Sequence, residues 1–181
     1  GHPRLRFELE TYTANQPYHF NKDADYKRRK SPATPVYSWA TGQLISSLTV
    51  IDSLSRNIKS GSRLPELALF ECSDCHQSIA NPSQISRLNK NFGTPSVNVA
   101  NLIMTHAIAL TIEPVIAKKI KRDISKLLID THSRSTVAGA LSGLQRQLRM
   151  LDESLSKIET DQIGGLTLAE NVVASVKQFS P

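Results

Sequence analysis

Aromatic residues are scarce in this sequence, and long hydrophobic runs are absent. Aromatics make up 6% of the 181 residues, a content that suits a helical bundle better than a β-sandwich. No apolar run approaches the roughly 20 residues that a transmembrane helix needs. The acidic residues are scattered and no nucleophile occupies a recognisable elbow. These absences favour an all-α fold without a membrane span and argue against a hydrolase.

Positive charge is in excess but is spread along the chain. The formal net charge is +6, which favours partners with acidic surfaces. Two basic runs stand out, at residues 27–30 and 118–122, and neither is interleaved with aromatic residues in a nucleic-acid-binding pattern. We therefore expect no nucleic-acid partner and interpret both runs first as solvated faces.

Both cysteines of the chain lie in one short motif, Cys72-Ser73-Asp74-Cys75-His76. The spacing C-x-x-C-H is the attachment pattern of c-type haem. Each thiol can add across one vinyl group of the porphyrin, and the imidazole that follows can bind the iron. The motif therefore predicts a covalently bound haem c, with thioether bonds from Cys72 and Cys75 and with His76 as the proximal iron ligand.

Three other roles for the two cysteines stay open. A thioredoxin-like redox pair needs a strand before the motif, whereas residues 64–71 have the pattern of a short helix. A structural zinc site needs four ligands, and the sequence has no second C-x-x-C and no H-x-x-x-H. A structural disulfide across two residues would close a tight loop that gains little entropy. The spacing favours haem attachment over all three.

The second iron ligand decides the chemistry of such a haem. Two imidazoles give a low-potential electron carrier, His with Met raises the potential, and an open position binds small molecules. The candidate distal ligand is His106, in the apolar run 101–110, although a histidine there could equally be a hydrogen-bonded core residue. His132 fits a solvated surface position, and Met104 and Met150 fit the core.

Apolar spacing and breaker residues predict an all-α, four-helix-bundle-like domain. The haem peptide lies between the first two long helices. The main helices are expected at about 35–60, at about 94–130 with a kink or break at Pro114, from Ser133 or Ser135 to Gly164-Gly165, and at about 167–179. Residues 1–35 read as an irregular N-terminal arm, and residues 36–181 as the haem-binding bundle.

Two of these helices have a clear apolar face. In the first helix the residues at three- and four-residue steps are Trp39, Leu44, Leu48, Ile51, Leu54 and Ile58. In the third helix a heptad seam runs through Leu141, Leu144, Leu148, Leu151, Leu155 and Ile158. The last helix is expected to begin with a capping box at Thr167-Leu168-Ala169-Glu170.

Several stretches of the first 80 residues occur together in a known family. They are Gly1-His2-Pro3-Arg4-Leu5, Phe7-Glu8-Leu9, Pro17-Tyr18-His19-Phe20, Trp39-Ala40-Thr41-Gly42-Gln43 and Leu69-Phe70-Glu71-Cys72-Ser73-Asp74-Cys75-His76. The series resembles the C-terminal part of multihaem c-type cytochromes related to the tetrahaem electron carrier of ammonia oxidation. Gln77 stands where that family often has a second histidine. The resemblance does not extend to the C-terminal helices beyond their helical character.

The resemblance implies further haem ligands and further haems. His2 and His19 are alternative distal ligands to this haem or ligands to a neighbouring haem. The chain begins with Gly and shows no signal peptide, so we expect an export signal, and upstream haem motifs, to lie outside it.

We therefore expect an electron-transfer domain with one covalent haem, belonging to a multihaem protein or a multi-subunit complex in the periplasm or outside the cell. Its partners would be other haem domains or redox proteins with acidic surfaces. It is expected to be an electron carrier or an oxidoreductase subunit more than a catalyst by itself. Two alternatives stay open: a haem-based sensor or catalytic module with an open iron site, and a haem-free helical interaction domain that associates through the leucine seam.

Overall fold

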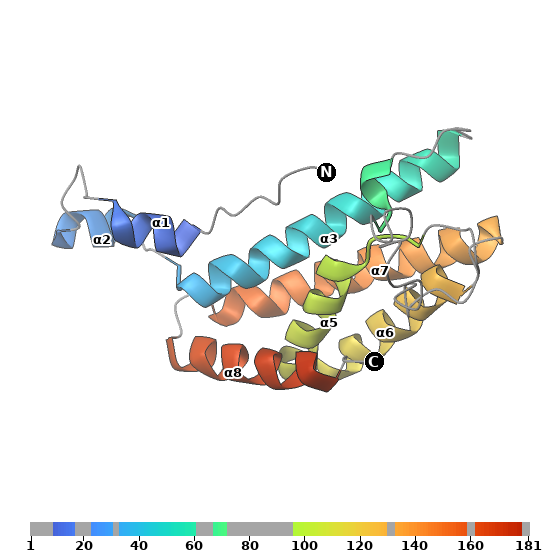
Figure 1. Cartoon of the computed structure of the whole chain (residues 1–181). Coiled ribbons are helices and arrows are strands. Elements are labelled where there is room, and N and C mark those ends of the chain that lie inside the picture. Colours follow the sequence, from blue (N-terminus) through green and yellow to red (C-terminus); the bar gives the residue numbers. More distant parts are fainter. Residues whose placement is uncertain are drawn as a thin grey trace, which may run out of the picture.

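Helices make up nearly all of the chain that can be described (Figure 1). The structure is a computed structural model, and it describes residues 9–16, 23–30, 33–60, 67–71, 96–129, 133–158 and 162–178. Within those ranges the β-type pairing is a single isolated bridge between Phe70 and Val97. The prediction of an all-α fold is confirmed.

The elements follow one another from α1 to α8. They are α1 (Leu9–Asn15), α2 (Ala24–Lys30), α3 (Pro35–Ser60), the 3-10 turn η1 (Leu67–Leu69), α5 (Ala100–Ile112), α6 (Pro114–Ile129), α7 (Arg134–Leu155), the 3-10 turn η3 (Ser156–Ile158) and α8 (Gln162–Gln178). The described parts of the N-terminal arm are therefore helical, where the sequence suggested irregular structure. In Figure 1, α1 and α2 lie beyond the start of α3.

The first long helix has the predicted bounds. Thr34 caps α3, because its Oγ1 accepts a hydrogen bond from the backbone N–H of Tyr37 at 3.2 Å. Pro35 occupies the first helical position, where its missing N–H costs nothing. The predicted apolar face is buried at Leu44, Ile51 and Leu54 and partly buried at Leu48 and Ile58. The prediction that Trp39 belongs to this buried face is wrong, since Trp39 is 38% exposed.

The predicted second helix is two helices that meet at Glu113. Pro114 cannot donate a backbone hydrogen bond, so α5 ends at Ile112 and α6 starts at Pro114. The start of this region also differs from the prediction: residues 96–99 are not helical, and α5 begins only at Ala100. Thr94 and Pro95, the predicted helix start, lie outside the described residues.

The heptad seam of α7 is confirmed. Ser133 caps the helix by accepting a hydrogen bond from the N–H of Thr136 at 3.3 Å. The five seam leucines inside α7 are all at most 1% exposed: Leu141, Leu144, Leu148, Leu151 and Leu155. The seam helix ends earlier than predicted, at Leu155.

The two glycines predicted to end that helix lie inside α8, which begins at Gln162 and not at Thr167. Gly165 is buried where an added Cβ would contact Thr34 Oγ1 and Val36 Cβ at 3.7 Å. A small residue there brings α8 close to the start of α3. The contact comes from another part of the chain, so the local Gly-Gly pattern did not reveal it.

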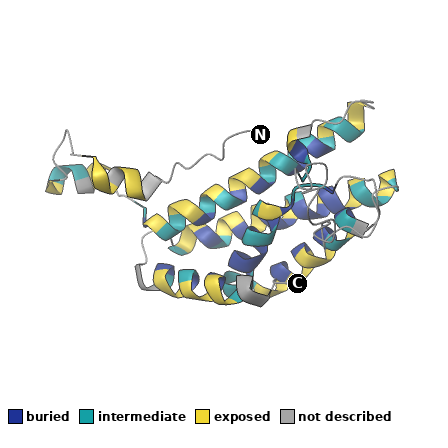
Figure 2. Ribbon diagram, viewed as in Figure 1, coloured by how far each residue is buried: buried dark blue, intermediate teal, exposed yellow. Residues whose placement is uncertain are grey.

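In the part of the chain that the structure describes, five helices rather than four form the body of the protein. α7 packs against α3 and α6, and α5 packs against α3, α6 and α8. The buried residues of these helices lie on the sides that face the neighbouring helices (Figure 2). A larger core cluster joins α3, α5, α6 and α7, and a smaller one joins α8 to α3, α5 and the end of α7. Among the described helices, none is both long and apolar enough to span a membrane.

Candidate functional site

The residues that carry the haem prediction lie outside the described part of the chain. This holds for Cys72, Cys75 and His76, and also for His2 and His19. The roles assigned to them therefore remain predictions from the sequence. The structure describes the residues on either side of the range 72–95 and the candidate distal ligand His106.

The residues that flank this range are hydrogen-bonded to each other. The N–H of Glu71 donates to the carbonyl of Ser96 at 2.8 Å, and the N–H of Asn98 donates to the carbonyl of Leu69, also at 2.8 Å. Phe70 and Val97 form the isolated bridge between these two bonds. Glu71 is the residue directly before Cys72 in the sequence. The C-x-x-C-H motif thus follows directly on a backbone position that is hydrogen-bonded to the segment preceding α5.

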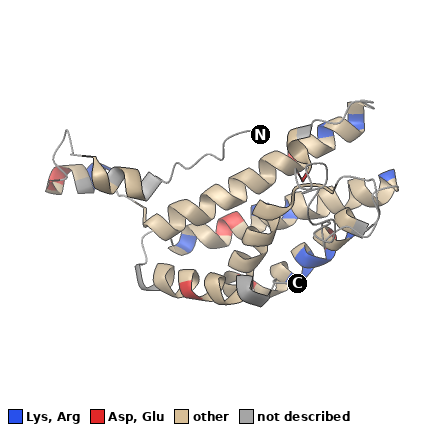
Figure 3. Ribbon diagram, viewed as in Figure 1, with Lys and Arg blue, Asp and Glu red and all other residues tan. Residues whose placement is uncertain are grey.

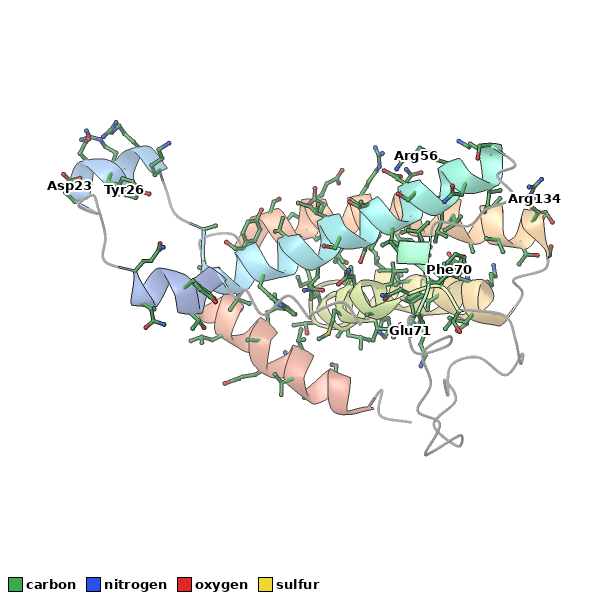
Figure 4. All side chains as sticks on the ribbon, turned by 45° about the horizontal axis from the view of Figure 1, so that its top comes forward. Asp23, Tyr26, Arg56, Phe70, Glu71 and Arg134 are labelled. Atoms are coloured by element: carbon green, nitrogen blue, oxygen red, sulfur yellow. The ribbon has the colours of Figure 1, made fainter. Side chains whose placement is uncertain are left out.

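Residues 69–71 and 96–98, which these hydrogen bonds join, are called the anchor. The anchor also packs against the core. Leu69 is 6% exposed and belongs to the larger core cluster, against which Phe70 and Val97 also pack. Figure 4 labels Phe70 and Glu71, on the side of the bundle where α3 ends and α7 begins. The expected short helix before the motif is only the 3-10 turn η1 in the described residues, because the hydrogen bonds to Ser96 and Asn98 hold the next residues extended.

His106 lies inside α5 and is 3% exposed. Burial, together with the positive charge of Lys121 on α6, lowers the pKa of His106 below its usual value. The imidazole is therefore held neutral near pH 7. A neutral imidazole suits iron ligation and a core position alike, so the two roles that the sequence left open are both consistent with this environment.

A hydroxyl pair fixes α5 to α3 beside His106. Thr105 Oγ1 donates to the carbonyl of Asn101 at 2.8 Å, and it lies 3.0 Å from Ser47 Oγ. Because the single proton of Thr105 is used, Ser47 is the donor between the two hydroxyls. Both residues are fully buried. The pair satisfies two polar groups in the core and sets the position of α5 along α3.

A second buried polar group joins α6 to α7. The carboxylate of Asp123 is 2% exposed and accepts a hydrogen bond from Gln147 Nε2 at 2.8 Å. Arg122 Nε donates to the same carboxylate at 3.0 Å, and Lys126 Nζ lies 3.5 Å from it. Gly143 leaves the room for this carboxylate, since an added Cβ would lie 2.5 Å from Asp123 Oδ2.

Opposing effects set the charge state of Asp123. Burial by itself would raise the pKa of its carboxyl group. The hydrogen bonds from Arg122 and Gln147, and the charges of Arg122 and Lys126, outweigh burial and hold the pKa below its usual value. Asp123 is therefore a carboxylate at neutral pH, paired at the edge of the core.

Sequence reasoning missed Asp123 and Gln147, although a signal was present. Asp123 comes three residues after the buried Ile120 and four before the buried Leu127, so it falls on the apolar face of α6. Gln147 stands in the same relation to Leu144 and Leu151 on α7. Polar residues at core positions of two neighbouring helices indicate a buried polar pair.

A groove of about 210 Å³ lies between the second half of α3 and the first half of α7. Gln145 Nε2 donates to Asp52 Oδ1 at 2.8 Å in its lining. Arg56 and Lys59 add positive charge to the same lining, and Leu141 adds apolar surface. This mixture of charges does not select one class of ligand.

Met150, predicted as a core residue, is 47% exposed. Within the described ranges, no three His, Cys, Asp or Glu side chains form a group that could hold a metal ion.

Comparisons of the chain with known protein families, with curated proteins and with solved structures find no match. The resemblance to multihaem cytochromes therefore rests on the residues of the sequence quoted above.

The close fit at Gly143 yields a stability prediction. We expect Gly143→Ala to lower the free energy of unfolding by about 1–3 kcal/mol, because the new methyl group must displace the Asp123 carboxylate from Gln147. Gly139→Ala on the same helix is the matched control, since an added Cβ there has no described neighbour within 4 Å. The control should raise the free energy of unfolding by about 0.5–1 kcal/mol. Urea unfolding of both variants measures the two changes in the free energy of unfolding. Equal changes would contradict the close contact between residue 143 and the Asp123 carboxylate.

The lowered pKa of His106 predicts a dependence of stability on pH. Below pH 6.5 the unfolded chain binds a proton at this residue that the folded protein does not bind. The free energy of unfolding should therefore fall as the pH decreases from 6.5 towards the folded pKa, by at most about 1.4 kcal/mol per pH unit. In urea unfolding between pH 7.5 and 5, His106→Gln should show a smaller loss than the wild type. The Asp123 carboxylate titrates below this window, so it does not interfere. If the free energy of unfolding changed equally with pH in the wild type and in His106→Gln, His106 would not be a source of the pH dependence.

Proposed function

We propose that this chain is a c-type haem domain that transfers electrons. The observation that carries the proposal is the position of the motif: the only two cysteines and a following histidine come directly after Glu71, whose backbone is hydrogen-bonded to Ser96. A chance C-x-x-C-H has no need of such an anchor. A haem peptide does, because the position of the haem depends on it.

The donor set fits the cofactor. Two thiols with two residues between them match the two vinyl groups of the porphyrin, and the imidazole of the next residue matches the iron. Cys72 and Cys75 would hold the ring and His76 would bind the iron. When bound, the haem supplies a reversible one-electron couple.

The described residues would give the haem peptide a fixed base. Leu69 is buried in the core, and two backbone hydrogen bonds join residues 69–71 to residues 96–98. From there the chain continues into α5, which packs chiefly against α3, α6 and α8. Electron transfer depends steeply on the distance between the centres, and a base of this kind limits how far the peptide can shift relative to the bundle.

A histidine would complete the coordination in an electron carrier. His106 is the candidate in the described part of the chain, and its lowered pKa keeps it in the neutral form that binds iron. His2 and His19 are the alternatives that the family resemblance implies. The proposal also implies that the chain is exported before haem attachment, and that its partners are other haem domains or redox proteins.

Covalent attachment is the first consequence to test. Protein matured in a host that attaches c-type haem should keep a sharp reduced α band after acid–acetone extraction. The double variant Cys72→Ser/Cys75→Ser should release all of its haem, because both thioether bonds are lost. Ser73→Ala/Asp74→Asn, which changes the two residues between the cysteines, is the matched control and should keep the haem. A colourless wild-type protein from such a host would disprove the proposal.

The second ligand separates the electron carrier from a module with an open iron site. We expect a low-spin iron in the wild type and a change to high-spin iron in one of three single variants, His106→Gln, His2→Gln or His19→Gln. Absorption spectra with and without carbon monoxide identify the variant, because the open position binds the gas. A wild-type protein that is already high-spin and binds carbon monoxide would favour the sensor or catalytic alternative.

A further inference from the structure

The outer face of α6 carries positive charge without any carboxylate. Five cationic side chains of this helix are exposed: Lys118, Lys119, Lys121, Arg122 and Lys126. The helix has one acidic residue, Asp123, and that residue is buried. Figure 3 shows Lys and Arg along α6. The charge is therefore segregated to the solvent side of the helix and is not balanced there.

The neighbouring helix extends this surface. Gly143 and Gln147 of α7 face Asp123, and Arg146 lies between them in the sequence with an exposed side chain. Arg146 is three residues after Gly143, so it lies near the α6 side of α7. We use the name basic face for six exposed side chains: Lys118, Lys119, Lys121, Arg122, Lys126 and Arg146.

The buried carboxylate of Asp123 contacts two cations of the basic face. This carboxylate accepts from Arg122 Nε at 3.0 Å and from Arg122 Nη2 at 3.3 Å, and Lys126 Nζ lies 3.5 Å away. The hydrogen bonds orient the Arg122 side chain, which is still 61% exposed. Six cations stand against this buried carboxylate and against the exposed Glu153, which lies seven residues after Arg146 on the same side of α7, so the basic face keeps a positive excess.

Exposed apolar side chains accompany the cations. Val115 of α6 is 65% exposed, and Met150 of α7 is 47% exposed. Val115 is seven residues before Arg122 and so lies on the same side of α6. Met150 is seven residues after Gly143 and so lies on the α6 side of α7. Arginine and methionine are both enriched where proteins contact each other.

We propose that the basic face is a docking surface for a protein with an acidic surface. A membrane fits less well, because the apolar side of α6 is already buried in the core at Ile116, Ile120 and Leu127 and cannot enter lipid. A single-stranded nucleic acid fits less well, because α6 contains no aromatic residue on which unpaired bases could stack, and binding to a DNA duplex is an outcome of the test below. The proposal concerns α6 and α7 alone and is independent of haem binding.

The test compares two charge reversals of equal size. Lys118→Glu/Lys119→Glu changes the basic face, and Arg56→Glu/Lys59→Glu makes the same change in net charge at exposed positions of α3. The probe is a fluorescein-labelled oligoglutamate peptide, and its affinity is measured by fluorescence anisotropy at low and at physiological salt. We expect the α6 variant to bind about tenfold more weakly at low salt and the α3 variant to stay within about threefold of the wild type. Binding by the wild type should weaken as salt increases.

Two further measurements decide the class of partner and guard against misfolding. Circular dichroism should show the helix content of the wild type in both variants, and the neutral pair Lys118→Gln/Lys119→Gln should give an intermediate affinity. Equal losses in the α6 and α3 variants would overturn the proposal, because net charge alone would then explain binding. Tighter binding of the wild type to a DNA duplex, or to phosphatidylcholine vesicles containing phosphatidylserine, would also overturn it. So would an absence of peptide binding at low salt.

Discussion

The leucine side of α7 connects both parts of the core. Leu141, Leu144, Leu148 and Leu151 pack in the larger cluster with α3, α5 and α6, and Leu155 packs in the smaller cluster with α8. Burying one such side chain contributes about 1.5–3 kcal/mol, so the seam supplies a large share of the stability of a domain this size. Helices as short as α5, with 13 residues, are marginal by themselves in water. They persist because α7 and its neighbours bury their apolar faces.

Polar groups inside this apolar body define how the helices sit against one another. A hydrophobic seam tolerates some sliding, whereas a buried carboxylate loses its partner if the helices shift. Asp123 and Gln147 hold α6 against α7, and Ser47 and Thr105 hold α5 against α3. Asp123 has a second consequence. Because the only acidic residue of α6 is buried, the outer side of the helix carries cations and no carboxylate, so the burial of Asp123 gives rise both to the core pair and to the basic face.

The backbone hydrogen bonds at Glu71 fix the position of the residue that precedes the C-x-x-C-H motif. Two backbone hydrogen bonds and the burial of Leu69 hold residues 69–71 against residues 96–98. The proposed haem function depends on this arrangement. The basic face does not depend on it, and the two can fail or succeed separately.

Much of the fold could be predicted because helix periodicity is a local property. The bounds of α3, the break at Pro114, the burial of α5 and the leucine seam of α7 all follow from residues a few positions apart. The C-x-x-C-H motif and the net charge are likewise properties of the sequence by itself.

Contacts between distant segments decided the remainder. α5 begins at Ala100 because Ser96 and Asn98 bond to residues 69–71, and α8 includes Gly164 and Gly165 because it packs against the start of α3. Trp39 and Met150 are exposed, and Asp123 is buried. These differences arise because the neighbouring helices cover one side of each helix and leave the other open. The sequence by itself determined where the long helices lie and which residues could carry a haem, whereas α1, α2 and the starts of α5 and α8 did not follow from it. Only the tertiary structure decided which helix faces meet, because burial and hydrogen bonding depend on partners that no local pattern contains.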